Sequence, residues 1–415
     1  MEKKLEPKLR FKEFSEGWKS QNLEEVSVKI SDGIHSTPIY SEGTDYYFIN
    51  GNNLDSKSIK IFDNTKCVSK EEYLKHKREL SSDNTILLSI NGTIGNLSYY
   101  NDETVVLGKS ACYINLKDNI SKEFIFNKLQ THRIKNYFEG ELTGSTIKNL
   151  SLKTIKNTKV LLPPLPEQEK IASFLSSVDS RIEKLEKKKE LLEQYKKGSM
   201  QKIFTQEIRF KDDNGNDYPE WVEKRLGEIT TLMQSGLSRK LSDKDIGVPV
   251  IRSNNLQNGR FKTHDIKYWH KIDDKGAKME NYYLKEKDLL VNFINSLSQI
   301  GKVSIYNNEF DREIIFTTNI MRLNFKENID PKYIFNLFQA KRYADFIQSI
   351  SKPAVSQASF TTVDFKMFKF KLPCLEEQEK IANFLSSIDK KIEVVTKEIE
   401  RNKEFKKGLL QQMFC

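Results

Sequence analysis

The sequence contains few of the residues that build metal and redox centres. Its 415 residues include only 4 cysteines and 5 histidines. The cysteines stand far apart, at Cys67, Cys112, Cys374 and Cys415. The histidines are His35, His76, His132, His264 and His270. Neither set has zinc-ligand or redox-motif spacing, so we expect cytosolic thiols, with no disulfide framework and no metal in this chain.

Long apolar runs and nucleotide-binding motifs are also missing. No stretch of about 18 apolar residues could span a membrane, and the charged start at residues 1–6 lacks the apolar core of a signal peptide. We therefore expect a cytoplasmic protein. Gly108-Lys109-Ser110 looks like the end of a phosphate-binding loop, but Glu103 stands where that loop needs its first glycine. There is no Gly-x-Gly-x-x-Gly and no Asn-Pro-Pro-aromatic motif, so we predict a non-catalytic chain that holds no cofactor.

Charge is abundant, with 68 Lys and Arg against 58 Asp and Glu, a net charge of +10 and a pI near 9.0. This balance permits a polyanion such as nucleic acid as a partner but does not require one. The length exceeds what one ordinary core supports, so two or more domains are expected.

One stretch of the chain occurs twice. Residues 162–172, Leu-Pro-Pro-Leu-Pro-Glu-Gln-Glu-Lys-Ile-Ala, return at 372–382 as Leu-Pro-Cys-Leu-Glu-Glu-Gln-Glu-Lys-Ile-Ala. The step from Gln168 to Gln378 equals the step from Phe204 to Phe414. A larger block precedes each copy. The sequence thus predicts a duplicated protein with blocks at 1–160 and 207–370 and helical segments at 161–206 and 371–415.

Each repeated stretch has the features of a long helix. Pro166 fits the first turn, where its missing N–H has no intrahelical partner, and Glu167 suits the positive end of the helix dipole. Apolar residues recur with heptad spacing at Ile171, Leu175, Val178, Ile182, Leu185, Leu192, Ile381, Leu385, Ile388, Ile392, Val395 and Ile399.

This periodicity predicts that the two helices pair as an antiparallel coiled coil with pseudo-twofold symmetry. Four polar residues, Lys189, Lys196, Asn402 and Lys406, interrupt the apolar positions. The alternative is two amphipathic helices, each lying on its own domain.

Both blocks mix strands and helices, so the fold class is α+β. In the first block, strand-like runs at 46–49, 85–90 and 111–114 adjoin turns, and 121–137 has helical character. The second block repeats the plan, with 251–256 matching 49–54 and a helix expected over 331–350. The sequences between these anchors differ strongly. A shared scaffold with divergent filling suggests two similar domains that read different targets.

Polar and basic turns supply the candidate nucleic-acid contacts. Asparagine suits adenine edges, arginine suits guanine, and Lys, Ser and Thr suit phosphates. The candidates are His35, Ser36, Asn52, Asn53, Thr93, Lys148, Arg239, Lys240, Arg252, Asn254, Asn255 and Ser296. The alternative is that Asn, Gly and Ser simply form turns, and for any single residue this alternative is favoured.

Taken together, the pattern resembles the specificity subunit of type I restriction–modification systems. The resemblance rests on 162–172, its copy at 372–382, the junction 201–210 and the segment 32–38, Asp-Gly-Ile-His-Ser-Thr-Pro. It implies that each block is a target-recognition domain for one half of a bipartite double-stranded DNA site. It also implies that the two long helices separate the domains and dock two methyltransferase subunits. Translocase–nuclease subunits are then expected to join this complex. S-adenosylmethionine, ATP and Mg²⁺ are then expected in those partners. The chief competing interpretation is a coiled-coil scaffold that binds other proteins, and a fused enzyme is a third.

Overall fold

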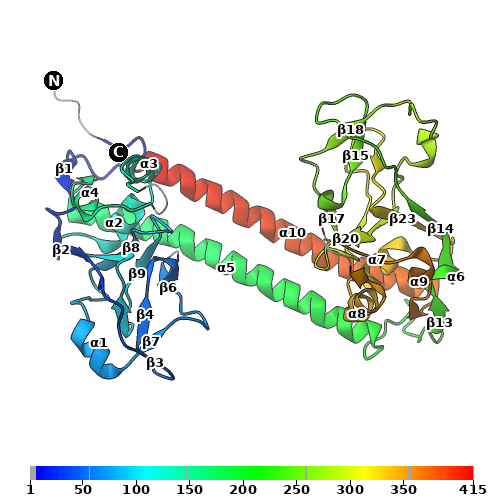
Figure 1. Cartoon of the computed structure of the whole chain (residues 1–415), viewed down its shortest axis with the longest axis horizontal. Coiled ribbons are helices and arrows are strands. Elements are labelled where there is room, and N and C mark those ends of the chain that lie inside the picture. The colour runs from blue at the N-terminus through cyan, green and yellow to red at the C-terminus, as the bar shows by residue number, and fades with distance from the viewer. Residues whose placement is uncertain (1–5, 56, 145–147, 258, 354–356, 415) are drawn as a thin grey trace. The chain divides into compact units, whose positions relative to one another are not determined.

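The computed structural model describes residues 6–55, 57–144, 148–257, 259–353 and 357–414. It contains two compact units, each assembled from segments far apart in the sequence (Figure 1). Unit 1 comprises Met1–Glu186 and Lys397–Cys415, and unit 2 comprises Lys187–Thr396. Each unit therefore contains one block together with parts of both long helices. Among the described residues, no helix is long and apolar enough to cross a membrane.

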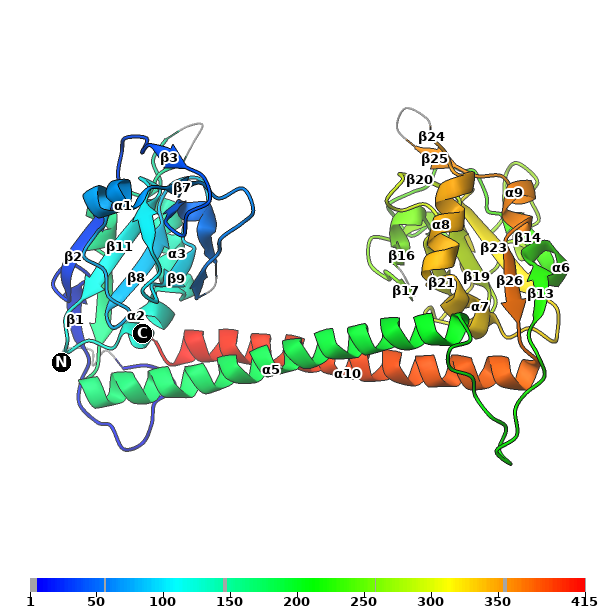
Figure 2. The ribbon, with the colours of Figure 1, turned by 90° about the horizontal axis from the view of Figure 1, so that it is seen from below.

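The first block is built around an antiparallel sheet in the order β2-β11-β8-β9 (Figure 2). Its strands are Ser27–Asp32, Ala111–Leu116, Thr85–Ser89 and Leu97–Tyr99. A second sheet, β10-β4-β7-β3, consists of Val105–Leu107, Tyr47–Ile49, Cys67–Val68 and Tyr40–Ser41. Two strand pairs complete the block: β1 (Lys19–Asn22) with β12 (Lys159–Leu162), and β5 (Leu54–Asp55) with β6 (Ser58–Ile59).

The second block repeats this topology. Its main sheet, β14-β23-β19-β21, consists of Thr230–Ser235, Ile320–Phe325, Leu289–Asn292 and Val303–Ile305. The second sheet, β18-β15-β22, consists of Lys267–Trp269, Val248–Ile251 and Ile315–Phe316. The remaining strands are β13 (Val222–Arg225), β26 (Lys369–Leu372), β16 (Leu256–Gln257), β17 (Arg260–Phe261), β20 (Ile294–Asn295), β25 (Ala358–Ser359) and β24 (Lys352–Pro353). The prediction of two mixed blocks with one shared scaffold is confirmed.

Each block also contains short helices. In the first block they are α1 (Lys70–His76), α2 (Lys122–Leu129), α3 (His132–Gly140), α4 (Leu152–Lys156) and the 3₁₀ turn η1 (Gly51–Asn53). In the second they are α6 (Leu226–Ile229), α7 (Pro331–Leu337), α8 (Lys341–Ile350), α9 (Thr362–Lys366), η2 (Ser253–Asn255) and η3 (Met279–Asn281).

The helix expected over 331–350 is two helices, and so is the helical stretch 121–137. Thr131 and Ala340 have extended backbone, with ψ of 147° and 152°, and each begins a new helix. The turn lets the second helix fold back on the same core, where Phe338 stacks on Tyr343 with ring centroids 4.2 Å apart. Apolar periodicity alone does not reveal such a break, because both helices bury their apolar faces in one core.

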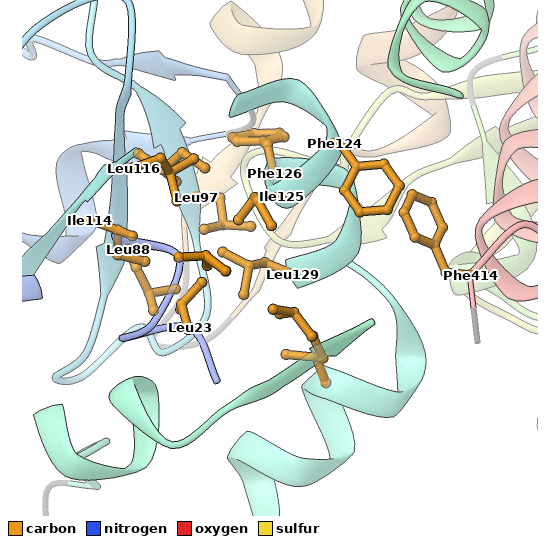
Figure 3. Packing of buried hydrophobic residues seen from close by; sticks show 14 of the residues in the cluster. Leu23, Leu88, Leu97, Ile114, Leu116, Phe124, Ile125, Phe126, Leu129 and Phe414 are labelled. Atoms are coloured by element: carbon orange, nitrogen blue, oxygen red, sulfur yellow. The ribbon is translucent and has the colours of Figure 1, made fainter. Parts of the chain in front are cut away.

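The core of unit 1 joins the sheet, α2 and the C-terminal end of the last helix. Leu88, Ile114 and Leu129 are buried in one cluster with Phe414 (Figure 3). Leu409 belongs to the same cluster. The Phe124 and Phe414 rings lie 5.1 Å apart, centroid to centroid. Residues from the far end of the sequence thus complete the core of the first block.

The two long helices are α5 (Leu165–Phe204) and α10 (Leu375–Gln412). The heptad positions Ile171, Leu175, Val178, Ile182, Ile381, Leu385, Ile388, Val395 and Ile399 are buried, whereas Leu185, Leu192 and Ile392 are half-buried. The first turns of α5 pack into the core of the first block and those of α10 into the core of the second. Part of each apolar stripe therefore holds a block on its helix, as the alternative interpretation required.

The polar interruptions Lys196 and Lys406 form equivalent ion pairs. In unit 2, Lys196 Nζ lies 2.7 Å from both carboxylate oxygens of Asp389. In unit 1, Lys406 Nζ lies 2.6 Å from Asp179 Oδ1. Lys196 and Lys406 occupy equivalent positions in the two repeats, and so do Asp179 and Asp389. In each unit, α5 and α10 are thus linked by a lysine of one helix and an aspartate of the other.

Candidate nucleic-acid interface

A glycine at the end of β2 brings the segment 32–36 against a neighbouring strand. Gly33 N–H donates to Ala111 O at 3.1 Å, and Ile34 N–H donates to Leu107 O at 2.7 Å. A Cβ on Gly33 would lie 2.0 Å from Leu107 O, so only glycine permits this approach. The next residues, His35 and Ser36, are exposed. His35 Nε2 lies 2.9 Å from Asp32 Oδ2, and its side chain is 72% exposed.

The second block contains the same device, which local sequence comparison missed. A Cβ on Gly236 would lie 2.0 Å from Phe316 O, and Leu237 N–H donates to that oxygen at 2.9 Å. The residues that follow, Ser238 and Arg239, occupy the places of His35 and Ser36. The glycine is the signal that could have found this match, because the neighbouring residues differ.

Arg239 is held inside unit 2. Its Nε and Nη2 donate to Asp273 Oδ1 and Oδ2 at 2.6 and 2.8 Å. The Asp273 side chain is fully buried and also accepts from Trp269 Nε1 and Ala277 N. The guanidinium of Arg239, helped by these two donors, holds the pKa of the Asp273 carboxyl well below its usual range. The structure therefore gives Arg239 a supporting role, whereas the adjacent Lys240 is exposed.

The matching Asn-Asn pairs divide into one buried and one exposed residue. Asn53 Oδ1 accepts from Asn50 N–H at 3.0 Å, and Asn255 Oδ1 accepts from Arg252 N–H at 3.0 Å. Asn53 Nδ2 donates to Lys60 O at 2.8 Å. Both side chains are buried and cap their turns, which corrects their interpretation as DNA contacts.

The other members of these turns face solvent. Asn52 and Asn254 are exposed. Arg252 Nη2 donates to Asp265 O and Oδ2 at 2.7 and 3.1 Å, and Asn254 Nδ2 donates to the same carboxylate at 3.2 Å. In unit 2 the Asp265 carboxylate therefore already accepts hydrogen bonds from both Arg252 and Asn254. Either side chain would have to leave Asp265 before it could contact a base.

Thr93 and Lys148, distant in sequence, lie on neighbouring loops. Asn91 and Asn149 form an antiparallel bridge that joins the loops. Beside them is a groove of about 790 Å³ whose lining includes Gly92, Gly95, Lys135, Phe138, Leu142 and Lys148. In the second block the equivalent bridge joins Ile294 to Ser359, and the exposed Ser296 lies two residues after Ile294. Residues 145–147 of the expected turn lie outside the described residues.

The family model for the type I restriction modification DNA specificity domain matches residues 15–194 and again 218–402. The chain belongs to this family of specificity subunits. The two matches coincide with the two copies of block and helix.

Named relatives agree with this assignment. A putative type I restriction enzyme MjaX specificity subunit from Methanocaldococcus jannaschii is 31% identical over 213 residues, which cover 51% of this chain and 49% of the relative. The aligned part is thus about half of that protein. The MjaVIII specificity subunit from the same organism is 28% identical over 357 residues, which cover 82% of this chain and 81% of the relative.

Solved structures show the same fold. The type I restriction–modification S subunit from M. genitalium superposes with a TM-score of 0.59 at 16% identity, covering 99% of both chains. A chain from a study of complex assembly and conformational transition of the type I R-M system superposes with a TM-score of 0.56 at 15% identity, covering 96% of this chain and 98% of that one.

The repeated Glu-Gln of this specificity subunit attaches each block to its helix. Buried Glu167 accepts from Arg10 Nε and Nη2 at 2.7 and 2.8 Å, and from Trp18 Nε1 at 3.3 Å. In unit 2, Glu377 accepts from Arg209 Nη2 at 3.0 Å and Trp221 Nε1 at 2.8 Å. We call these two clusters the carboxylate clamps. Their residues were visible as repeats in the sequence, but their mutual contacts were not.

The neighbouring glutamines fasten a second element. Gln168 Oε1 accepts from Ser121 N–H at 3.1 Å, and Gln378 Oε1 accepts from Asp330 N–H at 2.9 Å. Ser121 and Asp330 are the N-caps of α2 and α7. Each Gln therefore fixes the start of a block helix against the start of a long helix.

No group of three or more His, Cys, Asp or Glu side chains suited to a metal ion occurs within the part of the chain that the structure describes. The exposed candidates that remain for DNA contact are His35, Ser36, Asn52, Thr93, Lys148, Lys240, Asn254 and Ser296.

Proposed function

We propose that this specificity subunit is the DNA-recognition component of a type I restriction–modification complex, each block reading one half of a bipartite double-stranded site. The observation that carries the proposal is the pair of equivalent glycine turns. Gly33 and Gly236 make the same close approach to a neighbouring strand, yet the exposed side chains that follow are His35 and Ser36 in the first turn and Ser238 and Lys240 in the second. The same frame with different exposed side chains suits two different half-sites.

We further propose that α5 and α10 form an antiparallel coiled coil that sets the distance between the half-sites. The equivalent pairs Lys196–Asp389 and Lys406–Asp179 support a single register with pseudo-twofold symmetry. A charged pair at a seam costs stability in exchange for register. In this proposal Lys196 and Lys406 select the register in which α5 and α10 pair.

Grooves beside the helices are candidate docking sites for two methyltransferase subunits. In unit 2 a groove of about 1350 Å³ is lined by Lys196, Lys197, Met200, Trp221 and Arg342, among others. In unit 1 a smaller groove of about 280 Å³ is lined by the counterparts Lys406, Lys407 and Leu410 together with His132. Two equivalent grooves suit two copies of one partner.

In this proposal the chain is non-catalytic and cytoplasmic. Methyltransferase and translocase–nuclease subunits would supply the chemistry with S-adenosylmethionine, ATP and Mg²⁺. Purified chain that transferred methyl groups by itself would contradict this part of the proposal.

The decisive experiment is block exchange read by methylome sequencing. A host carrying the complex is sequenced for methylated adenine, and residues 1–160 are then replaced by the block of another family member. One half of the motif should change while the other half stays the same. A change in both halves would show that the blocks do not read independently, and footprinting without any protected bipartite site would favour a protein scaffold.

A further inference from the structure

Lys57 has a backbone conformation that is unusual for a residue with a side chain. It lies in the tight β5–β6 hairpin with φ of +93°. Its counterpart in the second block, in the β16–β17 hairpin, is Gly259 with φ of +88°. The backbone contacts also match, because Lys57 N–H donates to Leu97 O at 3.4 Å and Gly259 N–H donates to Val303 O at 3.0 Å.

Glycine adopts such a φ without strain, whereas a residue with a Cβ pays for it in free energy. A strained residue persists where its surroundings gain something from it. At Lys57 the gain is an ion pair with α5. Its Nζ lies 3.0 Å from Asp179 Oδ2 and 3.1 Å from Glu183 Oε1.

Asp179 is where three elements of unit 1 meet. One of its oxygens contacts Lys57 of the first block, and the other contacts Lys406 of α10. The Asp179 side chain is only 11% exposed and that of Lys57 is 32% exposed, so solvent screens this contact less than a surface pair.

Lys57 adds a charged contact with α5 to the apolar packing and the Gln168 bond that already hold the first block on this helix. It lies twelve residues, or about 18 Å, beyond the carboxylate clamp at Glu167. A contact farther along the helix resists tilting of the block more than contacts beside the clamp do. Gly259 has no side chain that could make the same contact in the second block.

We propose that Lys57 is a positioning residue that fixes the tilt of the first block on the helices and so sets how strictly the complex measures the spacer between its half-sites. The inference rests on the proposed function. The residue contacts no base in this scheme and acts only through the helix.

The test uses the full chain with methyltransferase subunits and duplexes that carry its own bipartite site. Methylation rates are compared between the native spacer and spacers one base pair shorter or longer. Lys57→Gly and Lys57→Ala remove the attachment, and Lys57→Arg keeps it. Lys60→Ala is the matched control, because Lys60 pairs with Asp55 of the same hairpin and not with α5.

We expect wild type, K57R and K60A to prefer the native spacer equally. K57G and K57A should lose about threefold of that preference, the size that a partly exposed ion pair can supply. Thermal unfolding separates positioning from folding. K57G relieves the strained φ and should unfold no lower than K57A, even though both lose spacer preference.

Unchanged spacer preference in K57G would overturn the inference, and so would an equal loss of methylation on every spacer. A wild-type complex that methylates no bipartite sequence would contradict the proposed function itself, and the inference with it.

Discussion

Leu9 N–H donates to the carbonyl oxygen of Gln412 at 2.9 Å, which ties the start of the first block to the end of α10. The same bond occurs inside the chain, where Ile208 N–H donates to Lys202 O at 3.1 Å. Leu9 and Ile208 each precede the arginine of a carboxylate clamp, and Gln412 and Lys202 are equivalent by the repeat offset. In unit 2, residues 203–207 connect Lys202 to Ile208 along the chain. In unit 1, Gln412 and Leu9 lie in the same arrangement although no peptide segment connects them directly.

The first prediction is that a circular permutant folds and functions. Five residues separate Lys202 from Ile208, whereas Met413, Phe414, Pro7 and Lys8 supply four between Gln412 and Leu9. A one-residue linker from Phe414 to Pro7 therefore restores the internal spacing. With new ends between Gln206 and Glu207, the permutant should unfold near the wild-type temperature and methylate the same site. A permutant that folds but methylates a different motif would contradict the equivalence of the two junctions.

A second prediction concerns the half-protein of residues 1–206. In a symmetric dimer of this fragment, Lys196 of one copy should pair with Asp179 of the other, because Asp179 is the counterpart of Asp389. With methyltransferase subunits, the dimer should methylate an inverted repeat of the first half-site, since a twofold interface presents the same surface twice. K196D should weaken dimerisation in sedimentation experiments. K189A should not, because Lys189 pairs with Glu193 of its own helix. Methylation of the original asymmetric site by the dimer would refute the symmetry.

The third prediction tests the carboxylate clamp. Glu167→Gln removes the charge that Arg10 meets in a buried site. We expect a loss of about 2 to 3 kcal/mol in the free energy of unfolding, below the full cost of breaking a buried pair because Arg10 keeps some contact with solvent. E169Q changes an exposed carboxylate in the same turn and serves as the control in denaturant titrations. Equal stability of the two variants would show that the clamp contributes little.

The fourth prediction separates the two residues of an Asn-Asn pair. N53A should cost about 1 to 3 kcal/mol of folding stability, because Asn50 N–H and Lys60 O lose their hydrogen bonds to the buried Asn53 side chain. N52A should change stability by less than about 0.5 kcal/mol, since Asn52 is exposed. If Asn52 contacts DNA, N52A should instead weaken binding to the cognate duplex. Loss of stability in N52A would argue that it also has a structural role.

The fifth prediction concerns acid unfolding. The folded state lowers the pKa of Asp273 below its unfolded value, so this carboxylate stabilises unit 2 above the ordinary Asp pKa of about 3.9. That stabilisation is lost as the pH falls through the lower, folded pKa. Stability of the wild type should thus fall more steeply than that of D273N between about pH 4 and pH 2. Parallel curves in thermal unfolding would contradict the role of the Arg239–Asp273 pair.

The sequence revealed the repeat and the long helices because these features are regular. The helix α5 is recognisable from Pro166, Glu167 and the heptad residues, because these signals are local and do not depend on what the helix packs against. The polar contacts were less accessible, because they depend on the register between distant segments. Lys196 and Lys406 looked like defects in an apolar stripe until the helices placed Asp389 and Asp179 beside them.

The candidate DNA contacts divided for a similar reason. Asn53 and Asn255 have the same side chain as Asn52 and Asn254, and only burial distinguishes them. Arg239 has the chemistry of a guanine contact, but its partner Asp273 lies 34 residues further along the chain. Local pattern identified the turns, whereas the fold decided which of their side chains reach solvent.

The composition of unit 1 has a consequence for synthesis on the ribosome. The core of the first block includes Leu409 and Phe414, so the block translated first is the last to be completed. Unit 2 is complete once Thr396 has emerged. At about 5 to 20 residues per second, translation from Glu186 to Lys397 takes roughly 10 to 40 s. During that interval the first block exposes the apolar surface that the end of α10 will cover. A nascent chain stalled before residue 397 should therefore recruit chaperones to its oldest domain.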